Sequence, residues 1–157
     1  MKTSDILKLI FSVFICHSAG IIGSFFTVSS VNTWYTTIQK PFFTPPGWVF
    51  GPVWLTLYTL MGISLYLIWK RGITEKNKKG LIFFFIQLAL NGFWSIAFFG
   101  LQSPLFGLIV IIPLLAFILM TIFEFYNLNK TSAYLLIPYI AWVAIATALN
   151  TGVWILN

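Results

Sequence analysis

The sequence predicts an all-α membrane protein, a five-transmembrane-helix bundle that forms one domain over residues 1–157. Composition is the first observation behind this prediction: 59% of the residues are hydrophobic, only 8% are charged, and the mean hydropathy is +0.95. A soluble domain of this length could not bury so much apolar surface. The second observation is that the chain contains five apolar runs, each near the length of about 20 helical residues that crosses a bilayer. These runs lack the alternation of β-barrel strands, so helices are expected.

The first run covers residues 9–28 and is expected to remain as a membrane helix, since it lacks the small-residue cleavage site of a signal peptide. Small side chains recur along it at spacings of three and four, which favours close packing within the bundle or against a second copy of the chain. They are Ser12, Cys16, Gly20, Gly23 and Thr27. His17 lies beside this row, where a neutral imidazole bonded to a neighbouring helix is favoured over a haem ligand or a proton relay.

An aromatic and proline-rich segment, WYTTIQKPFFTPPGWVF at residues 34–50, leads into the second run, 48–69. Three prolines bar a continuous helix there, while the aromatic content is too high for a solvated linker. They are Pro41, Pro45 and Pro46. We therefore expect a structured loop over residues 30–46 that folds back over the bundle, with its rings at the membrane interface or capping a cavity.

The third run, 80–100, carries three polar side chains at four-residue spacing. They are Gln87, Asn91 and Ser95, with Trp94 beside them. An amide exposed to hydrocarbon is costly, so Gln87, Asn91 and, in the last run, Asn150 are expected to point into the bundle. Hydrogen bonding between helices is favoured for Gln87 and Asn150, whereas Asn91 could equally contact a ligand.

The fourth run, 104–126, is continuously apolar, and the fifth, 134–156, carries a row of side chains at four-residue spacing. The row is Trp142, Ala146, Asn150 and Trp154. On the second run, Trp54 and Tyr58 share one helix face. Trp54 and Trp142 lie on the outer halves of their runs, near the mouth under the proline-rich loop. An aromatic clamp at that position would suit a flat apolar ligand.

Basic residues are distributed unevenly between the two sides of the predicted bundle. Five spans place the N-terminus, the 70–79 loop and the 127–132 loop on one side, which carries eight of the nine basic residues. These eight are Lys2, Lys8, Lys70, Arg71, Lys76, Lys78, Lys79 and Lys130. The other side carries only Lys40. The positive-inside rule then predicts a multi-pass cell-membrane protein with its N-terminus in the cytoplasm and its C-terminus outside. Because the net charge of +6 follows from this topology, no nucleic-acid partner is expected.

Several chemistries lack the residues that they need. The chain has one His and one Cys, which cannot supply the about four ligands of a closed metal site or two axial histidines for haem. Its three carboxylates, Asp5, Glu75 and Glu124, lie at span ends or in a loop, and His17 has no convincing acid partner for a hydrolytic triad. We therefore expect no metal and no required cofactor, and a site built from aromatic rings, amides and shape.

Three stretches of the sequence carry a family resemblance in the order that the family shows. They are WYTTIQKPFFTPPGWVFGPVWLTLYTLMG at 34–62, QLALNGFWSIAFFG at 87–100 and PYIAWVAIATALNTGVWILN at 138–157. Together they resemble the translocator protein family, also called tryptophan-rich sensory proteins or peripheral benzodiazepine receptors. Residues 1–30 and 104–132 match that family only in being apolar and of the right length.

The resemblance implies a five-helix bundle, often a homodimer, that holds porphyrins such as protoporphyrin IX or haem, and benzodiazepine-type or isoquinoline-type ligands, within the lipid bilayer. The pocket residues that it implies are Trp34, Pro45, Pro46, Trp54, Tyr58, Asn91, Trp94, Ser95, Trp142, Ala146 and Leu149. Some members are reported to degrade protoporphyrin photo-oxidatively, with tryptophans that correspond to Trp54 and Trp142. The Tyr and Arg of the cholesterol motif in animal members are missing from ATALNTGVWILN at 146–157.

Three functions from different classes remain open. The first is an integral membrane protein that binds or transports porphyrin-like tetrapyrroles and related flat hydrophobic ligands. The second is an enzyme that degrades porphyrin with light and oxygen, in which Trp54 and Trp142 act as redox partners. The third is a sensor or scaffold whose ligand shifts its association with another membrane protein. We favour binding, because nothing in the sequence independently requires a chemical reaction.

Overall fold

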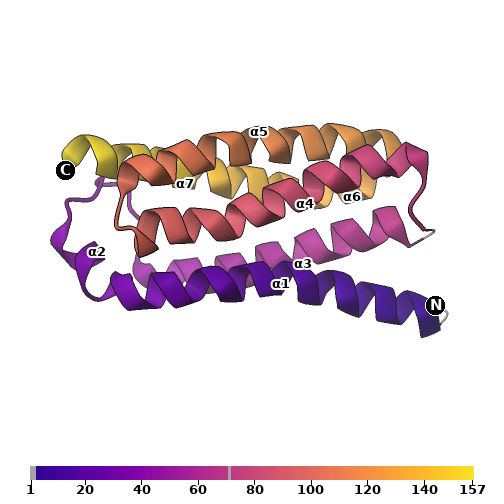
Figure 1. Cartoon of the computed structure of the whole chain (residues 1–157), viewed down its shortest axis with the longest axis horizontal. Coiled ribbons are helices and arrows are strands. Elements are labelled where there is room, and N and C mark those ends of the chain that lie inside the picture. The colour runs from indigo at the N-terminus through magenta and orange to yellow at the C-terminus, as the bar shows by residue number, and fades with distance from the viewer. Residues whose placement is uncertain (1–2, 71) are drawn as a thin grey trace.

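The computed structural model describes residues 3–70 and 72–157, and in these residues the chain folds as helices joined by short connections. Figure 1 shows the long helices running side by side along the long axis of the molecule. The elements in chain order are α1 (Thr3–Val31), α2 (Trp34–Thr37), the 3-10 helix η1 (Gly47–Val49), α3 (Phe50–Trp69), α4 (Glu75–Ser95), the π-helix η2 (Ile96–Gly100), α5 (Pro104–Leu128), α6 (Lys130–Leu135) and α7 (Ile137–Leu156).

In the part of the chain that the structure describes, five helical segments are long and apolar enough to cross a membrane, which confirms the predicted five-helix membrane fold. They are Thr3–Val31, Gly47–Trp69, Glu75–Gly100, Pro104–Leu128 and Lys130–Leu156. Most of the helices extend beyond the apolar runs into the polar residues that flank them. At these ends capping groups, rather than hydropathy, decide where a helix stops. The predicted 30–46 loop is correspondingly shorter, since α1 continues through Val31 and α2 adds one helical turn.

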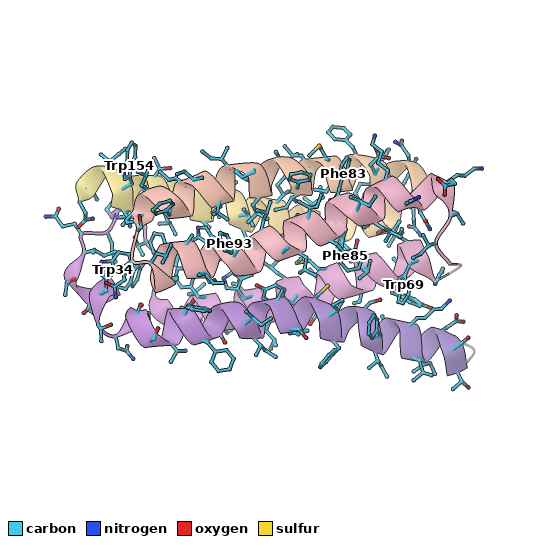
Figure 2. The ribbon with its side chains drawn as sticks, in the orientation of Figure 1. Trp34, Trp69, Phe83, Phe85, Phe93 and Trp154 are labelled. Atoms are coloured by element: carbon cyan, nitrogen blue, oxygen red, sulfur yellow. The ribbon has the colours of Figure 1, made fainter. Side chains whose placement is uncertain are left out.

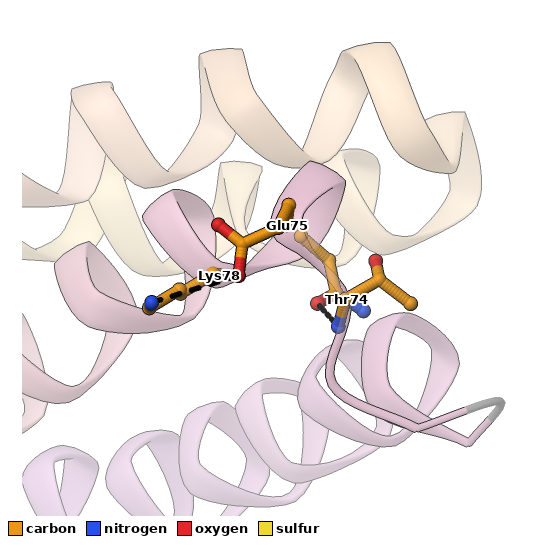
Figure 3. A network of polar contacts seen from close by, with 4 residues as sticks. Thr74, Glu75 and Lys78 are labelled. Carbon is orange, nitrogen blue, oxygen red and sulfur yellow. Dashed lines mark hydrogen bonds and ion pairs between the residues drawn. The ribbon is translucent and has the colours of Figure 1, made fainter.

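The start of α4 illustrates such a cap. The Asn77 side chain accepts a hydrogen bond from the Thr74 backbone N–H at 2.8 Å, and the Thr74 side chain accepts one from the Asn77 backbone in return. This reciprocal capping box satisfies two backbone donors that the first helical turn cannot. Figure 3 shows the same turn together with the ion pair between Glu75 and Lys78, whose charged atoms are 3.7 Å apart. That pair is largely exposed, so the cap contributes more to fixing the helix start.

Large side chains without solvent exposure form the core between α3, α4, α5 and α7. Phe84 of α4 stacks on Phe125 of α5, with ring centroids 5.8 Å apart and planes 13° apart. Gly80 lies beside this stack, and a Cβ at that position would come within 3.1 Å of the Phe125 ring. The glycine therefore permits the close approach of α4 and α5, as small residues do between membrane helices.

The row of small residues on α1 packs inside the bundle. Ser12, Cys16 and Gly23 are buried, and Ser12 Oγ accepts a hydrogen bond of 2.7 Å from Trp69 Nε1 of α3. On the facing helix, a Cβ added to Gly62 would overlap the backbone of Val13. The spacing of the small residues allowed packing within the bundle or against a second copy of the chain. In the described structure, another helix of the same chain packs against this row.

The outward faces of the helices are apolar. On α1, whose apolar window is only 17% buried, Phe14, Phe25 and Val28 are each more than 60% exposed. Figure 2 shows side chains projecting from the outside of the bundle along its length, with Phe83, Phe85 and other rings labelled. A continuous apolar exterior of this kind is stable in hydrocarbon rather than in water, which agrees with five membrane spans.

The segment between α1 and η1 folds back over one end of the bundle, where two contacts attach it to the last helix. The ring of the buried Pro41 packs so tightly on Gly152 that a Cβ there would overlap it. The Gln39 backbone exchanges two hydrogen bonds with the Asn157 side chain, each 3.0 Å long. Phe42 points fully outward. The segment thus combines the two expected features, a part that lies on the bundle and rings that face the surroundings.

The ends of the bundle carry different segments. Figure 1 shows the N-terminus and the turns before α4 and α6 at one end, and α2 and the C-terminus at the other. At the first end, Lys8 Nζ donates a 2.7 Å hydrogen bond to the Lys70 carbonyl, which ties α1 to the end of α3. Lys2 and Arg71, which belong to the basic side in the sequence analysis, lie outside the described residues.

Candidate ligand-binding cavity

A cavity of about 700 Å³ lies inside the bundle, toward the end that carries the proline-rich segment. Its wall is formed by α1, α3, α7, the end of α4 with η2, and the loop before η1. Rings dominate this wall. The aromatic lining residues are Tyr35, Phe50, Trp54, Tyr58, Trp94, Phe98, Phe99 and Trp142. A cavity of this size and composition falls in the range of small-molecule sites, about 300–1,000 Å³.

Nine of the eleven pocket residues implied by the family resemblance line this cavity. They are Pro45, Trp54, Tyr58, Asn91, Trp94, Ser95, Trp142, Ala146 and Leu149. The other two do not line it. Trp34 packs edge-on against Phe98, with ring centroids 5.5 Å apart, and so supports the wall from behind. Pro46 is exposed next to η1.

Trp54 and Trp142 enter the cavity wall from different helices. Trp54 of α3 stacks on Tyr58 one turn away, with centroids 5.4 Å apart and planes 25° apart. Trp142 of α7 meets Phe50 edge-on at 5.7 Å. Its indole N–H is buried and has no hydrogen-bond partner among the described residues. The two indoles therefore present apolar ring surface to the same cavity, and one of them carries an unpaired donor.

A chain of buried polar groups links the cavity wall to the core. Tyr58 Oη donates to Asn91 Oδ1 at 2.5 Å, Asn91 Nδ2 donates to Tyr139 Oη at 3.1 Å, and Tyr139 Oη donates to Gln87 Oε1 at 2.7 Å. These residues come from α3, α4 and α7, so the chain joins three helices. Gln87 points inward, as its cost of exposure predicts. Tyr139 was not predicted from the sequence, because an aromatic ring within an apolar run gives no signal of a polar role.

Asn150 bonds between helices, as the sequence analysis favoured. Its Oδ1 accepts from Trp94 Nε1 at 3.1 Å, and its Nδ2 donates to the Pro104 carbonyl at 2.7 Å. A Cβ on Gly107 of α5 would overlap the Asn150 amide, so a glycine is needed for this approach. Because Trp94 and Asn150 both line the cavity, their bond also holds the Trp94 ring in the wall.

The four-residue row on the last helix does not stay on one face. Trp142, Ala146 and Asn150 line the cavity, but Trp154 is 49% exposed and does not line it. An α-helix has 3.6 residues per turn, so each step of four residues advances by about 40° around the axis, and three steps by about 120°. The row therefore turns away from the cavity at its last member.

The π-helix η2 brings two rings to the cavity that the sequence analysis did not select, Phe98 and Phe99. Phe98 stacks on Trp94 with centroids 5.4 Å apart and planes 21° apart. The wider turn is closed by a 2.8 Å bond from the Leu101 N–H to the Ile96 carbonyl. Such π-turns are frequent at functional sites. A run of Ile, Ala and Phe gives no sequence signal that distinguishes a π-turn from an α-turn.

Helix α1 supplies the part of the wall that carries His17. The Thr59 hydroxyl donates its one proton to the Leu55 carbonyl at 2.9 Å, so it must accept from His17 Nε2 at 3.1 Å. The imidazole is thus bonded to a neighbouring helix, the interpretation favoured from sequence. Next to it, Gly20 lies so close to the Tyr58 ring that a Cβ would overlap it. In the described part of the chain, no three His, Cys, Asp or Glu residues gather where they could hold a metal ion.

In the described residues, five apolar helices, four of which line an internal aromatic cavity, define a multi-pass helical membrane protein with a site of small-molecule size. The chain belongs to the TspO/MBR family, whose model matches residues 12–155. It is 48% identical over 153 residues to the tryptophan-rich protein TspO of Archaeoglobus fulgidus, and the aligned region covers 98% of this chain and 99% of the relative. It is also similar to the human translocator protein, at 41% identity over 135 residues, 85% of this chain and 80% of the relative. The tryptophan-rich sensory protein of Cereibacter sphaeroides is 33% identical over 126 residues, 80% and 78% of the two chains.

Proposed function

We propose that this membrane protein binds porphyrin-like tetrapyrroles and related flat hydrophobic ligands in the cavity, and that it carries them as a transport protein. The observation that carries the proposal is the cavity of about 700 Å³, which three indoles from different helices line together, those of Trp54, Trp94 and Trp142. Stacking of aromatic rings contributes about 0.5–1.5 kcal/mol per pair beyond the burial of apolar area. A large conjugated macrocycle could use several of these rings at once.

Several polar groups of the wall are already hydrogen-bonded within the protein, which supports a ligand with a largely apolar ring system. Tyr58, Asn91 and Asn150 make side-chain hydrogen bonds to groups on neighbouring helices. They therefore contribute few unpaired polar atoms to the wall. The indole N–H of Trp142 is a buried donor without a partner among the described residues, and it is available to an acceptor atom on a ligand. The names of the relatives, translocator protein and tryptophan-rich sensory protein, support transport and sensing as uses of such a site.

A second candidate function is favoured by one specific contact, the stacking of Trp54 on Tyr58 at the cavity wall. Two adjacent oxidisable rings beside a bound porphyrin would suit a protein that degrades the porphyrin with light and oxygen. Trp142 would be the second indole of such a site. Binding remains the preferred function, because it needs only the cavity and its rings.

For localisation, we propose that the end with α2 and the C-terminus faces the outside of a cell membrane and that the N-terminus is cytoplasmic. The support is the distribution of basic residues along the sequence: Lys40 alone belongs to the side that carries α2 and the C-terminus, whereas the other eight belong to the side of the N-terminus. Short loops that are rich in lysine and arginine stay on the cytoplasmic side of the membrane.

Titration of the purified protein with protoporphyrin IX in darkness tests the binding function. Saturable quenching of tryptophan fluorescence and a shifted Soret band are expected. Trp54→Phe and Trp142→Phe each remove an indole but keep most of the ring area, so each should weaken binding by up to about tenfold, or 1.4 kcal/mol. Trp154→Phe, on the exposed side of α7, is the matched control and should leave the affinity unchanged.

Two results would contradict the proposal: no saturable binding to the parent protein, or an equal loss of affinity in the control and the cavity variants. A parallel titration under light separates the second candidate function. Degradation would be supported by a light-dependent loss of the Soret band that exceeds a no-protein control and disappears in both cavity variants while their affinity is kept.

A further inference from the structure

One charged side chain lines the cavity. Among the described lining residues, Lys40 is the only Lys, Arg, Asp or Glu; the rest are rings, aliphatic groups, hydroxyls, amides, glycines and His17. Lys40 lies in the loop between α2 and η1, at the end of the bundle that carries the proline-rich segment. A positive charge therefore stands at the mouth of an otherwise apolar cavity.

The backbone on both sides of Lys40 is held in place. The preceding Gln39 exchanges its two backbone hydrogen bonds with the Asn157 side chain, each at 3.0 Å. The following Pro41 is buried against Gly152 of α7. Residue 40 is thus fixed between two attachments to the last helix. A pre-positioned group of this kind loses little conformational freedom when it binds a ligand.

The ammonium group has donors to spare. Lys40 Nζ lies 4.8 Å from the centroid of the Tyr35 ring and donates one long bond of 3.3 Å to the Ile38 carbonyl. An ammonium carries three N–H donors. Lys40 is half-buried, and partial desolvation of its charge is costly. No ion pair offsets this cost, because neither of the two ion pairs in the described part of the chain includes Lys40.

The acidic side chains of the protein cannot serve as its partner. The chain has three, Asp5, Glu75 and Glu124. Asp5 lies in the first turn of α1, Glu75 begins α4 and pairs with Lys78, and Glu124 lies near the end of α5 and pairs with Lys79. Figure 1 shows these helix ends at the opposite end of the bundle from α2. No Asp or Glu side chain of the protein is therefore placed to pair with Lys40.

We propose that Lys40 binds a carboxylate of the ligand at the mouth of the cavity, so that the site selects flat hydrophobic acids over their neutral esters. The inference rests on the proposed binding function and extends it to the ligand's chemical class. A charge-assisted hydrogen bond is roughly twice as strong as a neutral one, and the apolar surroundings reduce its screening. The ring system of the ligand would stack inside while its acidic group reaches the loop.

Tyr35 completes the site for the carboxylate. Tyr35 lines the cavity together with Lys40. The Lys40 ammonium lies over the Tyr35 ring, where a cation–π interaction holds it. A tyrosine hydroxyl is protonated at neutral pH and has a proton to donate, and burial raises the pKa of Tyr35 further in the same direction. The pair therefore offers a cation from the loop before η1 and a neutral hydroxyl donor from α2.

A pair of porphyrins that share one ring system, and whose two carboxyl groups are either free or methylated, provides the test. Protoporphyrin IX carries two carboxylic acids, and its dimethyl ester carries none. The dissociation constants of both are measured in darkness at neutral pH, in an uncharged detergent without phospholipid, for the parent, Lys40→Met and Lys40→Arg. The parent should bind the acid about tenfold more tightly than the ester, as a partly exposed charge-assisted bond allows. Lys40→Met should bring this ratio close to one by weakening only the acid, and Lys40→Arg should keep the preference.

The matched control is Lys130→Met. Lys130 lies over the Tyr126 ring with its Nζ 5.5 Å from the centroid, the same arrangement as Lys40 over Tyr35, but it does not line the cavity. This variant should bind both porphyrins as the parent does. An equal affinity of the parent for acid and ester would overturn the role of Lys40 and leave the binding function intact. A Lys40→Met variant that weakens both porphyrins alike would also overturn it, because Lys40 would then support the loop. Failure of both porphyrins to bind would overturn the binding function together with this inference.

Discussion

Tyr139 of α7 bonds to two side chains of α4 through a single hydroxyl group, and one of them, Asn91, extends the network to α3. Its Oη accepts from Asn91 Nδ2 and donates to Gln87 Oε1, and Asn91 in turn accepts from Tyr58. Tyr139 and Gln87 are fully buried. The amides could be predicted to point inward, because exposure to hydrocarbon is costly for them. Their partner could not be predicted, because a tyrosine in an apolar run is equally compatible with the core, the interface or the cavity.

Removal of this hydroxyl is expected to destabilise the bundle. Tyr139→Phe leaves Gln87 Oε1 and Asn91 Nδ2 without their partner in a buried setting, at a cost of about 1–3 kcal/mol in the free energy of unfolding. Unfolding in mixed micelles of increasing denaturing detergent measures this change. Tyr134→Phe is the matched control: its ring is 58% exposed, so removing its hydroxyl should change the free energy of unfolding by less than about 0.5 kcal/mol. Equal changes in the two variants would show that the network contributes nothing.

At the scale of elements, the proline-rich segment and η2 determine the shape of the cavity. The segment is attached to α7 through Gln39 and Pro41. Prolines and rings predicted a structured loop, but not its attachment points, because Gly152 and Asn157 are far away in the sequence and carry no pairing signal. The π-helix likewise could not be predicted from the sequence, since its hydrogen bonds involve only backbone groups. It is this element that turns Phe98 and Phe99 into the wall.

Helix α1 shows why a membrane fold is easier to predict than a membrane site. Its apolar length was sufficient to predict a span, and its small residues to predict close packing. Whether that face meets a packed helix or a void depends on the neighbouring side chains. In the structure it does both: Cys16 is fully buried, while His17 and Gly20 line the cavity.

At the scale of the whole molecule, five spans follow from composition, because hydrocarbon thickness sets helix length. The cavity does not follow from composition, since a ring that fills a core and a ring that borders a void have the same hydropathy. The lining residues Pro45 and Leu149 were reached only through the family resemblance. Lys40 was visible in the sequence as the lone basic residue of its side, but its place on the cavity wall required the fold.

Orientation in the membrane is a property of the whole chain, and labelling of single cysteines in intact cells tests it. We expect a membrane-impermeant maleimide to label Thr36→Cys, in α2, but not Ile73→Cys, in the exposed turn before α4. Neither substitution changes the charge asymmetry that sets orientation. The native Cys16 is fully buried, so the parent protein serves as the unlabelled control. Labelling of Ile73→Cys alone would reverse the proposed orientation.

The central claim is that a flat hydrophobic ligand occupies the cavity between α1, α3, α4 and α7. The most direct measurement is the affinity for protoporphyrin IX after the cavity has been filled from within. Ala146 lines the cavity, and Ala148, two residues further along α7, is exposed on the outside. If both alanines are replaced by tryptophan in separate proteins, Ala146→Trp should lose at least about a hundredfold in affinity, or 2.8 kcal/mol, at unchanged helicity. Ala148→Trp should bind as the parent does. Equal affinities in the two variants, with both proteins folded, would contradict occupation of the cavity.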